Sequence, residues 1–93
     1  MNLATIIARN EEIMASDMDN EIVMMNIETG KYYNLGKTGS AIWGVLEKPM
    51  SVGELIEKLV ALYDISREQC EKDTLPFLTK LVENALILEQ KND

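Results

Sequence analysis

The chain has 93 residues, with nine Lys and Arg against sixteen Asp and Glu and no histidine, so its formal net charge is −7. This length suits one small domain with a modest core, and residues 1–93 are expected to form that single domain. Proteins bind nucleic acid largely through Lys and Arg, so a surface this acidic is repelled by its phosphates. No nucleic-acid partner is expected, whereas a basic segment of another protein would be attracted.

The sequence also indicates where the protein resides. No apolar run is long enough to span a bilayer, and the N-terminal MNLATIIARNEEIM lacks the basic region and cleavage site of a signal peptide. Cys70 is the only cysteine, so an internal disulfide cannot form, which is typical of a reducing compartment. We therefore expect a cytoplasmic protein with no membrane partner.

Before Gly36, short apolar runs alternate with turn residues. The runs are EEIMAS, EIVMMNI and KYYNL, and the segments between them are DMDN and ETG, whose Asp, Asn and Gly residues favour tight turns. This pattern predicts two hairpins and hence a three-stranded antiparallel meander. In the third strand, Tyr33 and Leu35 are expected on one face, and Tyr32 and Asn34 on the other.

After Gly36 the apolar spacing becomes that of helices. A first helix is predicted from Thr38 to about Glu47. Two later helices are predicted to begin after Ser51 and Ser66, because Glu54 and Gln69 follow these serines at the spacing of a capping box. The second helix carries the clearest apolar stripe, formed by Val52, Leu55, Ile56, Leu59, Val60 and Tyr63.

Pro76 interrupts the third helical pattern. It predicts either a kink in one helix or a second helix start capped by Asp73. Asn84 is expected to end this region in a left-handed conformation, with ALILEQ beyond it as a short extended tail packed on the core. An extended segment is also expected around Ile6 and Ile7. The third helical region is predicted to bury Cys70, Phe77, Leu78, Leu81 and Val82.

The residue inventory excludes most catalytic chemistry. Without histidine, and with one cysteine, the chain lacks the usual zinc ligands and the Ser-His and Cys-His pairs of nucleophilic catalysis. Gly36, Lys37 and Thr38 match only the end of a P-loop, because Lys31 stands where the motif needs its first glycine. We expect no metal, no cofactor and no enzymatic activity. An α+β domain with a small sheet followed by three helices, in winged helix-turn-helix order, then indicates a binding module.

A more specific likeness extends over residues 12–88. The chain resembles the PqqD-like family, the recognition elements that bind leader peptides of ribosomally made, post-translationally modified peptides. Two features of the resemblance are a Glu-Thr-Gly turn that leads into the third strand and a Gly-x-Ala-Ile-Trp sequence in the first helix. The residues that carry it are Tyr32, Tyr33, Leu35, Gly39, Ala41, Ile42, Trp43, Ser51, Val52, Leu55, Asp73, Phe77, Leu81 and Leu86.

The resemblance implies a mode of binding. In this family the leader adds as an extra strand, antiparallel to the third strand, in a groove closed by the third helix. An exposed strand edge offers backbone N–H and C=O groups for such an addition. Core packing and a solvated helix face are the alternative explanations for several of these positions. The resemblance implies that the peptide-binding residues are Lys31, Tyr32, Tyr33, Asn34, Leu35, Asp73, Phe77, Lys80 and Leu81.

Within the family, the chain looks most like the leader-binding half of a split lasso-peptide maturation system. This likeness implies two partners, a precursor leader peptide and a separate leader protease or other modifying enzyme. One alternative is a quinone-cofactor pathway chaperone that presents its peptide to a radical enzyme. Two others are an acidic adaptor and a winged-helix DNA-binding regulator, although the second helix carries Glu54, Glu57 and Asp64 against Lys58.

Overall fold

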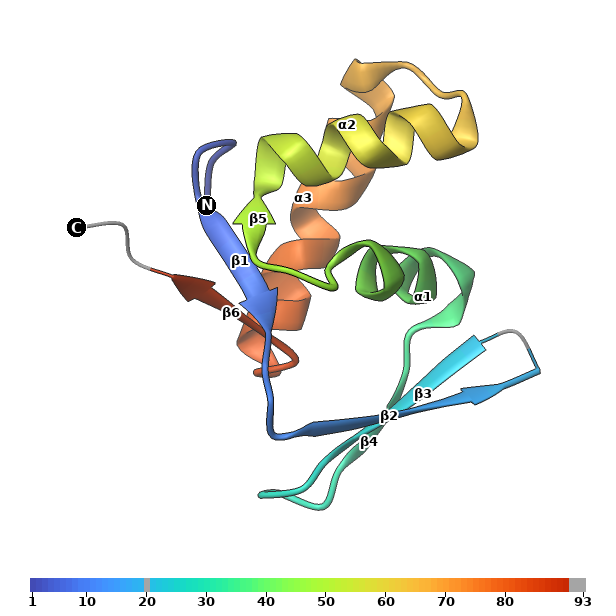
Figure 1. The fold of residues 1–93 in the computed structure, drawn as a ribbon, viewed down its shortest axis with the longest axis vertical. Coiled ribbons are helices and arrows are strands. Elements are labelled where there is room, and N and C mark those ends of the chain that lie inside the picture. Colours follow the sequence, from blue (N-terminus) through green and yellow to red (C-terminus); the bar gives the residue numbers. More distant parts are fainter. Residues whose placement is uncertain (20, 91–93) are drawn as a thin grey trace.

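The computed structural model describes residues 1–19 and 21–90, and within these it is an α+β fold (Figure 1). The predicted fold class is confirmed. The described part contains three helices and six short strands. In chain order they are β1 (Ile6–Arg9), β2 (Ile13–Met18), β3 (Glu21–Asn26), β4 (Tyr32–Asn34), α1 (Gly36–Val45), β5 (Met50–Ser51), α2 (Val52–Tyr63), α3 (Arg67–Glu83) and β6 (Ile87–Gln90).

The predicted meander is present as an antiparallel sheet in the order β2-β3-β4. The turn between β3 and β4 is organised by Asn26, whose side-chain oxygen accepts hydrogen bonds from the N–H groups of Glu28 (2.9 Å) and Thr29 (3.2 Å). Gly30 completes the turn at φ +75°, a conformation that favours glycine. In Figure 1 this sheet lies below α1.

A second antiparallel sheet, in the order β5-β1-β6, was not predicted. The segment around Ile6 and the tail at Ile87 are extended, as expected, and they pair with each other as β1 and β6. The two-residue β5 pairs with the other side of β1. Ile7 and Ile87 are fully buried, so this sheet closes one side of the core.

α2 and α3 begin where their capping residues predict. The Ser51 hydroxyl accepts a hydrogen bond from the Glu54 N–H, and the Ser66 hydroxyl accepts one from Gln69, each at 3.1 Å. α1 differs from the prediction because it begins at Gly36 and ends at Val45, two residues early at each end. Gly36 has φ +67°, which lets the chain reverse sharply between β4 and the helix.

α3 continues through Pro76 as one helix, so there is no second start at Asp73. A proline removes only one backbone donor, and the helix keeps its core contacts on both sides of it, through Thr74 and Leu78. The expected left-handed residue was wrong by one position: Asn84 has φ −92°, and Ala85 has φ +57°. The Asn84 side chain instead donates to the Lys80 carbonyl at 2.9 Å.

The core lies between the three helices and both sheets. Phe77 and Val82 are half-buried at its edge rather than inside it. Tyr63, a member of the predicted apolar stripe of α2, is 54% exposed, because α2 ends there and Asp64, at φ +51°, turns the chain away. The core residues are Ile7, Met24, Ile42, Trp43, Leu46, Met50, Val52, Leu55, Ile56, Leu59, Cys70, Leu78, Leu81, Leu86 and Ile87. Across residues 1–19 and 21–90, no helix has the length and apolar character needed to cross a membrane.

Candidate peptide-binding groove

β4 is an edge strand, since it pairs with β3 on one side only. Its register places Tyr33 opposite Met24, and the Asn26 N–H donates to the Lys31 carbonyl at 2.9 Å. In an antiparallel pair, residues with inward-facing backbone groups alternate with residues whose groups face outward. Tyr33 therefore pairs with β3, while the N–H and C=O groups of Tyr32 and Asn34 face the open edge.

The side chains of β4 divide between the two faces of the sheet as predicted. Tyr33 and Leu35 are half-buried and pack against the core. Tyr32 is 72% exposed, and Lys31 and Asn34 are exposed as well. The Asn34 side-chain oxygen accepts a hydrogen bond from the Gly36 N–H at 2.9 Å, so it helps to fix the turn into α1.

A close contact between the start of α1 and α3 closes the far end of this edge. Gly39, in the first turns of α1, is buried against Leu35 and Phe77. A Cβ atom built on Gly39 would lie 2.2 Å from the Leu35 Cβ and 2.9 Å from the Phe77 Cζ. Only glycine leaves room here, and its absence of a side chain lets α3 approach the end of β4.

A groove of about 680 Å³ opens beside this contact, between the start of α1, the end of α2 and the middle of α3. We call it the α1–α3 groove. Cys70 is buried at its base, where its sulfur lies 3.6 Å from the Thr74 hydroxyl. The groove is lined by Leu35, Gly36, Lys37, Thr38, Ala41, Ile42, Leu59, Tyr63, Ile65, Cys70, Asp73, Thr74 and Phe77.

The structure brings some of the predicted site residues together and separates others. Leu35, Asp73 and Phe77 line the α1–α3 groove, although they come from two different elements. The remaining residues of the third strand lie along the edge that leads to it. Lys80 is exposed and Leu81 is a core residue with 4% of its surface exposed, and neither lines the groove.

Sequence reasoning missed the wall that α2 contributes. Tyr63 and Ile65, at the α2–α3 corner, line the groove and are both exposed apolar residues. The apolar stripe of α2 grouped Tyr63 with the core residues. Periodicity does not show where a helix extends beyond the elements that pack against it. Gly39 was recognised as part of a motif, but its role in admitting Phe77 needed the tertiary structure.

The family model described as Coenzyme PQQ synthesis protein D (PqqD) matches residues 21–87. The chain belongs to the PqqD family. The match extends from the first residue of β3 to the first residue of β6, so it includes β4, α1, α2 and α3, which form the edge and the groove. No curated protein sequence gives a significant match.

Two solved structures resemble this PqqD-family chain over most of its length. The structure named "TbiB1 in Complex with the TbiA(beta) Leader Peptide" is 27% identical and has a TM-score of 0.80, with 91% of this chain and 99% of that chain covered. The structure named "Lasso peptide synthetase B1 complexed with the leader peptide" is 26% identical and has a TM-score of 0.74. It covers 88% of this chain and 96% of its own. Both of these structures are of a protein in complex with a leader peptide.

Proposed function

We propose that this chain binds the leader segment of a ribosomally made precursor peptide by β-strand addition along β4, and delivers it to a separate maturation enzyme. The observation that carries the proposal is the open edge of β4, where Tyr32 and Asn34 present unpaired backbone groups beside the α1–α3 groove. Main-chain hydrogen bonds would supply affinity, and the groove would select side chains. The two similar leader-peptide complexes support the same role.

Antiparallel pairing with β4 and the position of the α1–α3 groove together suggest which end of the leader lies at the groove. β4 runs from Tyr32 to Asn34, and Leu35, directly after it, lines the groove. A leader that pairs antiparallel to β4 would have its N-terminal part at the Leu35 end and its C-terminal part near Lys31. An apolar anchor on the N-terminal side of the paired segment would then enter the groove and contact Phe77.

The sheet has a second open edge at β2, but that edge lacks these features. Residues Met14–Met18 are all exposed, and Asp17 and Asp19 lie at its far end. Charged residues at an edge discourage strand addition. No residue of β2 lines the α1–α3 groove. The edge at β4 is therefore the better docking site.

The proposal makes this chain a binding protein that acts with a separate enzyme. A leader protease of a lasso-peptide system is the preferred partner, because one of the two similar structures is named as a lasso peptide synthetase B1 with its leader peptide. The family description leaves a quinone-cofactor pathway as the second candidate. The precursor peptide that binds distinguishes the two systems.

Calorimetric titration tests the proposed function directly. The titrant is a synthetic leader of the small precursor peptide encoded beside the gene of this chain, and we expect saturable one-to-one binding. A peptide of the same composition in scrambled order is the control, and we expect it to give no saturable heat. Equal binding of both peptides, or no binding of the leader at concentrations below a millimolar, would contradict the proposal.

A further inference from the structure

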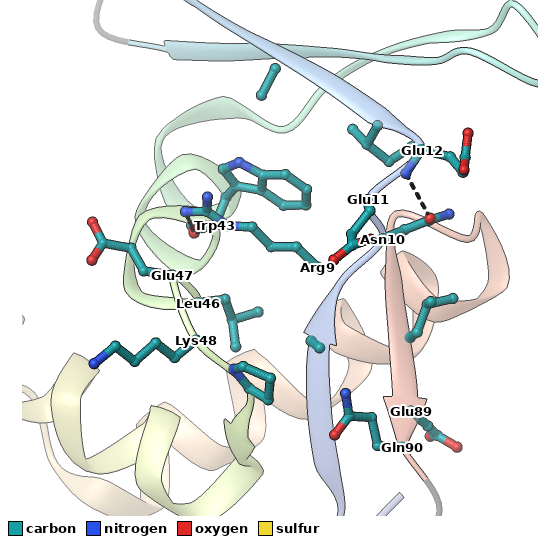
Figure 2. Close-up of a pocket in the computed structure, with 15 residues that line it drawn as sticks. Arg9, Asn10, Glu11, Glu12, Trp43, Leu46, Glu47, Lys48, Glu89 and Gln90 are labelled. Atoms are coloured by element: carbon teal, nitrogen blue, oxygen red, sulfur yellow. Dashed lines mark hydrogen bonds between the residues drawn. The ribbon is translucent and has the colours of Figure 1, made fainter.

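A second groove of about 680 Å³ lies at the junction of the two sheets and the end of α1 (Figure 2). We call it the β1–α1 groove. It shares no lining residue with the α1–α3 groove, so the two are separate surfaces. It is lined by Ala8, Arg9, Asn10, Glu11, Glu12, Ile13, Ala15, Trp43, Leu46, Glu47, Lys48, Pro49, Leu88, Glu89 and Gln90.

The base of the β1–α1 groove is apolar and held in place. Trp43 and Leu46 are core residues of α1 and of the turn after it. The Arg9 guanidinium donates two hydrogen bonds to the Trp43 carbonyl and lies 4.8 Å from the centroid of the Trp43 ring. Leu88, on β6, adds a side chain that is 45% exposed. Trp43 and Leu46 are themselves 5% and 1% exposed, so a partner would contact Leu88 and the exposed Pro49, which lie on this fixed base.

The loop on the rim is also fixed by hydrogen bonds. The Asn10 side-chain oxygen accepts from the Glu12 N–H at 3.0 Å, a bond drawn in Figure 2. Its side-chain nitrogen donates to the Ala85 carbonyl at 2.7 Å. The first bond shapes the β1–β2 loop and the second ties it to the start of the C-terminal tail, so the loop that carries Glu11 and Glu12 is fixed at the groove.

The rim carries an excess of carboxylates. Among the lining residues, Glu11, Glu12, Glu47 and Glu89 outnumber the two cations, Arg9 and Lys48, and Arg9 already contacts Trp43. Among residues 1–19 and 21–90, both ion pairs are made by Arg67, so none of these four carboxylates is neutralised by one. Arg9 keeps its positive charge, because the Trp43 carbonyl and ring are neutral, so four carboxylates against two cations leave the lining with a net charge of −2. An apolar base with this rim complements a segment in which basic residues flank an apolar side chain.

We propose that the β1–α1 groove is the docking site for the maturation enzyme, which inserts an apolar side chain flanked by Lys or Arg. This inference rests on the proposed function, since it names the surface that receives the enzyme to which the leader is delivered. Because the groove and the β4 edge share no residues, the protein would hold leader and enzyme at the same time. The net charge of −7 would also speed the encounter with a basic segment.

The test uses the double variant Glu11→Gln/Glu47→Gln and the purified leader-processing enzyme encoded beside the gene of this chain. Each lost rim carboxylate removes one exposed ion pair with the partner, so we expect the Kd for the enzyme to rise about three- to tenfold. The dependence of that Kd on salt should also decrease. Fluorescence anisotropy at two salt concentrations measures both effects.

Glu54→Gln/Glu83→Gln is the matched control, because it removes the same charge from exposed helix positions outside the groove. The Kd for the enzyme should stay at the wild-type value in this control. A third variant, Leu88→Ala, should weaken enzyme binding several-fold with an unchanged salt dependence, because it removes apolar contact only. Thermal melts of all variants establish that the fold is retained.

The affinity for the synthetic leader should be unchanged in all three variants, which separates this inference from the proposed function. If the leader fails to bind the wild-type chain, the proposed function is wrong. If the leader binds but the enzyme binds the groove variants as tightly as wild type, or does not bind the wild type, the assignment of the groove is overturned.

Discussion

Replacing Asn34 with proline is expected to weaken leader binding about tenfold or more while leaving the domain folded. The Asn34 N–H faces the open edge, so its loss does not remove a bond between β3 and β4. The leader carbonyl that would accept a hydrogen bond from this N–H is left without a donor. The proline ring also occupies the space where the hydrogen of this N–H would lie. Calorimetry with the leader measures the change in Kd.

Two variants isolate the backbone effect at Asn34. Asn34→Ala loses the side-chain bond to the Gly36 N–H but keeps its own N–H, so we expect a much smaller change in leader affinity than for proline. Tyr33→Pro removes an inward-facing N–H and should lower the melting temperature, because it breaks the ladder with Met24. If Asn34→Pro bound the leader as tightly as Asn34→Ala, the edge would not be the docking site.

Gly39→Ala is expected to lower the free energy of unfolding by about 1–3 kcal/mol, since the new methyl group overlaps a packed region. The built Cβ meets the Leu35 Cβ at 2.2 Å, and that atom cannot move without shifting the end of β4. Leu35 and Phe77 should separate, which would distort the groove and weaken leader binding as well. Urea denaturation and leader titration measure the two effects.

Gly44→Ala is the matched control in the same helix. Nothing lies within 4 Å of a Cβ built on Gly44, and the residue is exposed. Alanine has a higher helix propensity than glycine, so this variant should be more stable than wild type by up to about 1 kcal/mol. If both variants changed the free energy of unfolding in the same direction, this would contradict the close packing of Leu35 and Phe77 against Gly39.

Local signals predicted the helices and the meander well. Ser51 and Ser66 cap α2 and α3 through the bonds that their spacing indicates, and the turn predicted at ETG is present, with Gly30 at φ +75°. These features depend on residues a few positions apart, which sequence patterns record directly. The family resemblance added the assignment of the third strand as the docking edge, which stays a prediction.

The second sheet depended on contacts that no local pattern records. β1 pairs with β6 from the opposite end of the chain, and β5 has only two residues. The closing of the α1–α3 groove is a similar case. It needs Phe77 of α3 to approach Leu35 and Gly39 at the start of α1, and only the packed structure brings these parts together. The β1–α1 groove likewise gathers its four carboxylates from separate parts of the sequence.

Amide chemical-shift mapping of the wild-type chain with the synthetic leader tests the central claim most directly. The account predicts that the largest shifts fall on the outward amides of Tyr32 and Asn34 and on Asp73 and Phe77 of α3. The amides of Tyr32 and Asn34 should also become protected from hydrogen exchange when the leader binds. Largest shifts on β2, with β4 unaffected, would contradict strand addition at β4.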